Sequence, residues 1–270
     1  MTDARSALVL DEREGRLVAS EPDCPHCGGE GTVTVERPID PIYANLPHAV
    51  GATQTYQQAC VCAPARAAAR RITGAHLPYL GPGAGFERFV AYLDLGAEPE
   101  LGAQVAAAVD TARAFVARLG AVAPAPDRLF PMPDFPPGLV IAGGPLAGKT
   151  RLLAAVGLEA AQAGQRVRFL AWRTLAQLWS EPAKLNFDPV TFPGLLLIDD
   201  LDPSHREVDL LHFVNQRTRH GPTALTVAVD TAPEGALDLR RHLEPLTRTL
   251  VERLTSGGVC TLRLGPVRPA

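Results

Sequence analysis

The stretch GLVIAGGPLAGKT, residues 138–150, predicts a strand that turns through a glycine-rich loop into a helix. Its last eight residues fit the pattern GxxxxGK followed by S or T, with Gly143, Gly148, Lys149 and Thr150 at the fixed positions. Glycine permits a tight turn whose N–H groups converge on a phosphate, at the positive end of the following helix dipole. We therefore predict a nucleotide site in which Lys149 reaches the β- and γ-phosphates and Thr150 ligates Mg²⁺.

The nucleotide contacts expected from this loop are Gly143, Gly144, Pro145, Leu146, Ala147, Gly148, Lys149, Thr150 and Arg151. The alternative is a glycine-rich turn between a strand and a helix that binds nothing. The sequence that follows disfavours this alternative, because it supplies the second half of a nucleotide site.

The chain from residue 138 to its end alternates between short apolar runs and helical segments. The apolar runs are GLVIAG, VRFLAW, GLLLI, ALTVAV and VCTLRL, and the predicted helices cover 149–164, 173–180, 205–219 and parts of 235–256. Short apolar runs between helices are typical of a parallel sheet covered on both faces. The predicted fold is therefore α/β, with a P-loop NTPase core.

Two carboxylates follow the third apolar run, in LLLIDDLD. The carboxyl ends of parallel strands meet at the sheet edge where ligands bind. We expect Asp199 to hold the metal ion and Asp200 to orient the attacking water, which makes both catalytic together with Lys149. The alternative is a solvated acidic turn or a helix cap.

The chain from about residue 86 to its end resembles bacterial replicative helicase loaders of the DnaC/DnaI type and the related IstB transposition ATPases. The resemblance is carried by GGPLAGKTRLLAAVGLEAAQAGQRVRFLAWRTLAQLW, LLLIDDLD, FVNQRTRHGPTALTVAVDTAPEGAL and LVERLTSGGVCTLRLGPVRP. It implies an AAA+ ATPase that uses ATP and Mg²⁺. It also implies a replicative hexameric helicase and single-stranded DNA as partners, and an ATP site completed by a neighbouring subunit.

The resemblance assigns three further residues to the ATP site. Asp230 falls at the sensor 1 position, Arg253 at the arginine finger that enters a neighbour's site, and Arg268 at a sensor 2-like position. Sensor 1 is usually Asn or Thr, and an ionised Asp cannot donate a hydrogen bond. Either Thr226 or Thr231 is then the sensor, or hydrolysis is slow. For Arg253 the alternative is a solvated helix arginine.

Four of the five cysteines lie in two close pairs, CPHC at 24–27 and CVC at 60–62. In a reducing cytosol such spacing indicates a metal site rather than disulfides. The predicted zinc ligands are Cys24, Cys27, Cys60 and Cys62. His26 and His48 are reserve ligands, and Cys260 is expected in the core. A redox CxxC is the alternative, which the following glycines disfavour.

Many loaders carry such a zinc module and IstB proteins usually lack it, so the module favours a loader.

The predicted organisation has three parts. Residues 1–72 form a zinc-binding module that docks a partner, 73–137 connect it through a helix at 98–119 and a proline-rich loop, and 138–270 form the ATPase core without a separate C-terminal lid. Arg66, Arg70 and Arg71 follow Cys62 on a predicted helix and are open candidates for phosphate contact.

The net charge of −3 gives no global basic field for nucleic acid. The N-terminal residues lack the pattern of a signal peptide, and no apolar run approaches the ~18 residues of a membrane span, so we expect a cytoplasmic protein. The function expected is ATP-dependent loading of the replicative helicase onto single-stranded DNA. The alternatives are an IstB-type transposition helper and a nucleotide-binding adaptor with weak or absent hydrolysis.

Overall fold

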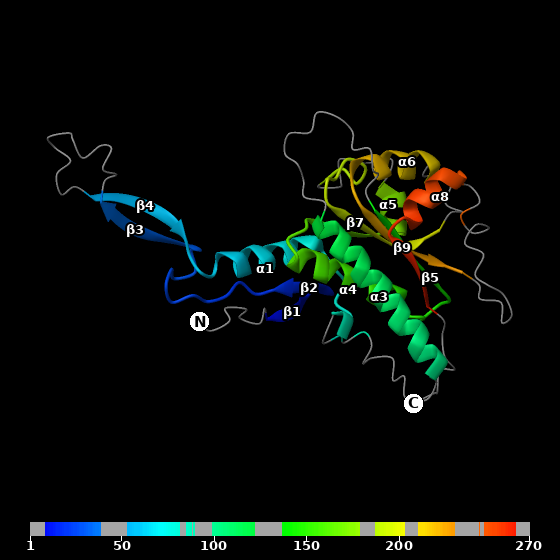
Figure 1. The fold of residues 1–270 in the computed structure, drawn as a ribbon, viewed down its shortest axis with the longest axis horizontal. Helices are drawn as coiled ribbons and strands as arrows, with labels where there is room; N and C mark the ends of the chain where they lie inside the picture. The colour runs from blue at the N-terminus through cyan, green and yellow to red at the C-terminus, as the bar shows by residue number, and fades with distance from the viewer. Residues whose placement is uncertain are drawn as a thin grey trace. The chain divides into compact units, whose positions relative to one another are not determined.

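The computed structural model describes residues 9–38, 53–81, 85–87, 89, 99–121, 137–178, 187–202, 210–229, 243 and 246–262. The chain divides into two compact units. The first unit is Met1–Asp11 with Val18–Arg70, and the second is Glu12–Leu17 with Arg71–Ala270. Figure 1 shows the elements of both.

The second unit is built on a five-stranded sheet with the order β6-β7-β8-β5-β9, and all its strand pairs are parallel. The strands are β5 (Gly138–Gly143), β6 (Val167–Ala171), β7 (Leu195–Leu201), β8 (Thr223–Ala228) and β9 (Gly258–Leu262). Every residue of β5 is buried, as expected for the centre of a sheet covered on both faces. The α/β fold predicted from the alternating runs is confirmed.

Helices cover both faces of this sheet (Figure 1). They are α3 (Pro99–Ala121), α4 (Lys149–Gln162), α5 (Trp172–Leu178), α6 (Leu210–His220) and α8 (Arg248–Thr255). The buried side chains of α5, α6 and α8 form one core with alternate residues of β5, β7 and β8. Helices α3 and α4 pack beside each other, α4 against β7 and α3 against β9. The strand-helix alternation thus places the loop between β5 and α4 at the carboxyl edge of the sheet.

One strand differs from its prediction. The apolar run ends at Ile198, yet β7 continues through the acidic pair to Leu201. Its pairing with β8 shifts register between Ile198 and Leu201. A strand is therefore able to extend beyond its apolar run when the neighbouring strand continues the pairing.

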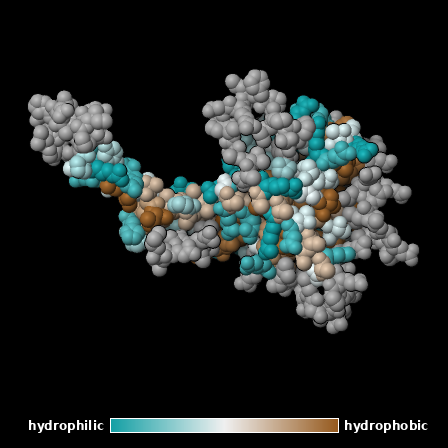
Figure 2. Space-filling view, viewed as in Figure 1, coloured by the Kyte–Doolittle hydropathy of each residue, from teal (hydrophilic) through white to brown (hydrophobic). Residues whose placement is uncertain are grey.

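The first unit contains an antiparallel hairpin of β3 (Thr32–Pro38) and β4 (Thr53–Ala59), in which Val35 lies opposite Tyr56. All residues of β4 are exposed, and Figure 2 shows hydrophilic residues over much of this hairpin. This hairpin was not predicted. Strand β4 has polar residues on both faces and lacks the alternation that marks a half-buried strand, although the TVTV run of β3 does alternate.

The chain also forms a shorter hairpin and a helix that follows the second cysteine pair. A short hairpin joins β1 (Leu10–Arg13) to β2 (Arg16–Ala19). Helix α1 (Ala63–Ala75) follows Cys62 directly, as predicted. Within the described residues, no helix combines the length and the apolar composition that crossing a membrane requires.

Candidate functional site

The loop between β5 and α4 has the backbone that phosphate binding requires. Gly148 caps the N-terminus of α4 with φ 85 and ψ 11, and Leu146 also has a positive φ of 58. At Gly143 a Cβ would lie 2.3 Å from the carbonyl oxygen of Leu262 on β9, so only glycine fits there. Left-handed residues within a loop turn successive N–H groups towards one side and create a concave anion site.

Lys149 lies across this loop. Its Nζ donates to the carbonyl oxygen of Gly144 at 2.8 Å. Burial lowers the pKa of the Lys149 ammonium below its ordinary value, although Asp200 and Asp199 act in the opposite direction. The carboxylates that act on the Lys149 charge are thus the two that the sequence assigned to the same site.

Three polar side chains from three elements meet beside the loop. Thr150 of α4 donates its hydroxyl towards Asp199 of β7, at 3.1 Å from Oδ1 and 3.0 Å from Oδ2. Thr226 of β8 donates to Asp199 Oδ1 at 2.7 Å. The structure therefore brings Thr150 and Asp199 together, as the predicted magnesium site needs. A hydroxyl and a carboxylate oxygen are ligands that suit Mg²⁺.

Asp200 adopts a different geometry from its neighbour. It has a positive φ of 58, its side chain is exposed, and its backbone N–H donates to Thr226 Oγ1 at 2.7 Å. Its carboxylate is thus free of the buried contacts that hold Asp199, a condition that a water-orienting group needs.

A segment far upstream in the chain packs against the loop, a contact that was not predicted. Phe89 is fully buried, and a Cβ on Gly148 would lie 3.2 Å from its Cε2 atom. Arg151, which was expected to contact nucleotide, donates its guanidinium to the carbonyl of Leu80. Gly148 therefore serves both the left-handed turn and a close approach to Phe89.

The residues assigned by the resemblance are only partly visible. Asp230, Thr231 and Arg268 lie outside the described residues, as does His48. Arg253 lies on α8, where its side chain is half-buried. The roles of these residues in an ATP site remain predictions.

The first unit brings the four paired cysteines together. Their sulfur atoms all lie within 4.8 Å of one another, and none forms a disulfide. Cys24 and Cys60 sulfurs are 3.6 Å apart, and those of Cys27 and Cys62 are 3.5 Å apart. Tetrahedral Zn–S bonds of about 2.3 Å separate sulfurs by about 3.8 Å, so the cluster could hold a zinc ion. His26 is exposed, whereas Cys260 is buried in β9 as expected.

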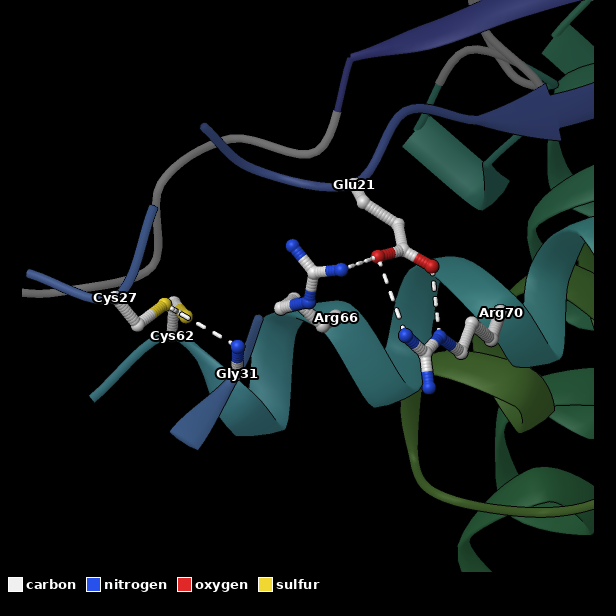
Figure 3. Close-up of polar contacts among 6 residues, drawn as sticks. All are labelled: Glu21, Cys27, Gly31, Cys62, Arg66 and Arg70. Carbon is white, nitrogen blue, oxygen red and sulfur yellow. Dashed lines mark hydrogen bonds and ion pairs between the residues drawn. The ribbon is translucent and has the colours of Figure 1, made fainter. Parts of the chain in front are cut away.

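The glycines after CPHC shape this cluster (Figure 3). Gly28, Gly29 and Gly31 have positive φ values of 56, 90 and 82. The N–H of Gly31 donates to Cys27 Sγ at 3.2 Å and lowers the pKa of this thiol to about 6. An N–H donor stabilises a thiolate, the form that ligates a metal.

The three arginines after Cys62 all make contacts within the chain. Arg66 and Arg70 both pair with Glu21, and the Arg70 Nε lies 2.7 Å from Glu21 Oε1 (Figure 3). The hydrogen bond from Arg70 lowers the pKa of the Glu21 carboxyl. Arg71 donates to the carbonyl oxygen of Ala161 at 3.0 Å. Each of the three arginines thus has a partner within the chain, and contact of these side chains with phosphate stays a prediction.

The order of the strands, the loop after β5 and the acidic end of β7 together decide the fold class. The second unit has an α/β fold with a P-loop. No family model matches the chain, and no curated protein matches it. Solved structures do match. One is the crystal structure of the DnaC helicase loader, with 18% sequence identity and a TM-score of 0.44; the match covers 59% of this chain and 90% of that chain.

Two more structures show the range of this similarity. The crystal structure of DnaI has 20% identity, covers 67% of this chain and 89% of that chain, and has a TM-score of 0.43. AMPPCP-bound DnaA from Aquifex aeolicus has 22% identity and a TM-score of 0.45. The match covers 69% of this chain and 52% of the DnaA chain, so this chain spans about half of that DnaA chain. Helicase loaders are among the solved structures to which the chain is similar. At these identities the likeness concerns the fold.

Proposed function

We propose that this protein binds ATP with Mg²⁺ at the loop after β5 and hydrolyses it slowly, as a switch. The observation that carries this proposal is the meeting of Thr150 with both carboxylate oxygens of Asp199, beside the loop that holds Lys149. Thr150 and Asp199 would hold the magnesium ion, which supplies positive charge beside the β- and γ-phosphates.

The residues of the chain have distinct parts in this proposal. The N–H groups of the loop bind phosphate oxygens. Lys149 releases the carbonyl oxygen of Gly144 and donates to the phosphate oxygens instead. The exposed carboxylate of Asp200 orients the attacking water, and Arg253 completes the site of a neighbouring subunit. Hydrolysis that depends on a neighbour is slow in the isolated chain, which suits a switch better than a motor.

The wider role proposed is delivery of a replicative hexameric helicase onto single-stranded DNA. Its support is the sequence resemblance to loaders over about residues 86–270, together with the cysteine cluster ahead of the ATPase. In this proposal the first unit, with zinc bound, docks the helicase. The ATP state of the second unit then controls release.

Nucleotide binding is tested with Lys149→Ala and a matched control, Arg173→Ala, which removes an exposed cation on α5. A charge-assisted hydrogen bond contributes about 1.5–3 kcal/mol, so Lys149→Ala should weaken ATP at least about tenfold. Titration of a fluorescent ATP analogue measures this. Unchanged affinity in Lys149→Ala would refute the site.

The cellular role needs a separate experiment. Hexameric helicase captured from the source cell is mixed with the full chain and circular single-stranded DNA, and loading is scored with ATP and with ADP. Nucleotide-dependent loading supports the proposal. Assembly on duplex DNA with a transposase supports the IstB-type alternative, and helicase binding without any ATP turnover supports the adaptor.

A further inference from the structure

The acidic pair at the end of β7 lies on an irregularity of the sheet. The register of β7 on β8 shifts between Ile198 and Leu201, so Asp199 and Asp200 stand opposite the single residue Thr226. Two residues opposite one define a β-bulge, a feature that re-aims side chains near active sites. The positive φ of Asp200, 58, is the local backbone change that accompanies this bulge.

One hydroxyl, that of Thr226, forms hydrogen bonds with both residues of the bulge. Thr226 is fully buried, accepts the Asp200 N–H at 2.7 Å and lies 2.7 Å from Asp199 Oδ1. A hydroxyl has one proton to donate. Because the Asp200 amide must be the donor in its bond, the Thr226 proton is free to point at the Asp199 carboxylate. The two bonds therefore have a fixed direction.

The sheet order explains why Thr226 can do this. Strand β8 lies between β7, which holds Asp199, and β5, which leads into the phosphate loop. Side chains of a strand alternate between its faces, so Ala228 is the next residue of β8 on the side of Thr226, and it carries no polar group. Within β8, Thr226 is thus the residue that serves the acidic pair.

We propose that Thr226 is a positioning residue, which holds Asp199 in the orientation that binds Mg²⁺ and stabilises the turned backbone that exposes Asp200. This inference rests on the proposed nucleotide site. It assigns Thr226 the role of orienting Asp199, rather than that of a sensor that contacts the γ-phosphate. Groups that orient a metal ligand typically change metal affinity by about 10–100-fold when removed.

The test compares Thr226→Val, which keeps the branched shape, with Thr226→Ser, which keeps the hydroxyl. Thr223→Val is the matched control, since Thr223 is a buried threonine of the same strand whose hydroxyl has no hydrogen-bond partner among the described residues. The readout is the Mg²⁺ concentration that gives half of the magnesium-dependent gain in affinity for a fluorescent ADP analogue. Affinity in EDTA is measured in parallel.

We expect Thr226→Val to raise this Mg²⁺ midpoint by about 10–100-fold while affinity in EDTA stays unchanged. Thr226→Ser should keep the wild-type midpoint, and so should Thr223→Val. A wild-type midpoint in folded Thr226→Val, or a shift of equal size in Thr226→Ser, would overturn the inference. If Thr226→Val does not fold, Thr226→Ala against Thr226→Ser provides the same comparison.

Failure of this inference is distinguishable from failure of the proposed function. A wild-type chain that binds no nucleotide, or binds it without regard to Mg²⁺, refutes the nucleotide site itself. A wild-type chain with a clear Mg²⁺ midpoint that Thr226→Val leaves in place refutes only the role of Thr226.

Discussion

The Thr150 hydroxyl lies 3.1 and 3.0 Å from the two carboxylate oxygens of Asp199, although 49 residues separate them in the chain. Thr150 is in the first turn of α4, and Asp199 is near the end of β7. The parallel sheet brings them together because both the loop after β5 and the end of β7 lie at its carboxyl edge. This relationship is the basis of the nucleotide predictions.

Asp199→Asn should abolish the dependence of nucleotide affinity on Mg²⁺. The amide keeps the shape of the side chain but removes the negative charge that attracts the cation. We expect little change in EDTA and a loss of most of the gain that Mg²⁺ normally gives, measured by titration of a fluorescent ADP analogue. Asp110→Asn, at an exposed position of α3, is the control. A normal Mg²⁺ response in Asp199→Asn would contradict the metal assignment.

Gly148→Ala should weaken nucleotide binding more than Gly164→Ala does. Both glycines have positive φ values, 85 and 98, but a Cβ at Gly148 would lie 3.2 Å from Phe89 Cε2 and one at Gly164 would meet nothing within 4 Å. The left-handed backbone costs each variant roughly 1–2 kcal/mol of stability. Only Gly148→Ala should also lower ADP affinity, by at least about tenfold, since loss of a single charge-assisted phosphate contact is sufficient for this.

Isothermal titration calorimetry and thermal unfolding together measure the two effects on these glycine variants. Equal loss of ADP affinity in both would show that general destabilisation, rather than the contact with Phe89, accounts for it.

The purified chain should contain one zinc ion, which mass spectrometry of metals detects. Cys24→Ser and Cys60→Ser should each lose it, because each removes one of four ligands of a closed site. Cys260→Ser is the matched control: this buried cysteine donates to the carbonyl oxygen of Ala108 at 3.2 Å and lies outside the cluster.

If the first unit docks a helicase as proposed, removal of zinc by a chelator should abolish helicase binding before it affects ATP affinity. The physical reason is that zinc would fold the small module that carries the four cysteines, whereas the second unit has a core of its own. Chelation that removed nucleotide binding and left partner binding intact would show that the division of roles between the units is wrong.

Arg217→Met should destabilise the second unit by at least about 2 kcal/mol. The Arg217 side chain is 1% exposed and donates to the carbonyls of Phe192, Gly194 and Pro222, the last two at 2.6 and 2.8 Å. The Pro222 carbonyl also accepts from the N–H of Leu196, but those of Phe192 and Gly194 would lose the Arg217 donor, which costs about 1–3 kcal/mol each. Urea unfolding measures the loss, and the exposed Arg219→Met should stay within about 0.5 kcal/mol of wild type.

The cysteine cluster and the phosphate loop could both be predicted because their signals are local. The spacing of CPHC and CVC indicated the four ligands, and the structure brings the four sulfurs within 4.8 Å. The alternation of apolar runs likewise predicted the strands of the second unit. Prediction failed where a segment had polar residues on both faces, as in Thr53–Ala59.

The contacts that position the site were beyond the sequence because they join distant segments. Thr226 lies 27 residues from Asp199, and its role depends on a one-residue shift in the register of two strands. Phe89 reaches Gly148 from outside the sheet, and Glu21 bridges two arginines of α1 that the sequence offered as phosphate contacts.

By itself the sequence determined the fold class, the phosphate loop and the set of cysteines, since local spacing and periodicity follow from the geometry of single strands, turns and helices. Only the tertiary structure decided which hydroxyl holds Asp199 and why Asp200 turns outwards. Both depend on the pairing register of β7 and β8, which arises when two strands pack side by side and which neither strand encodes alone.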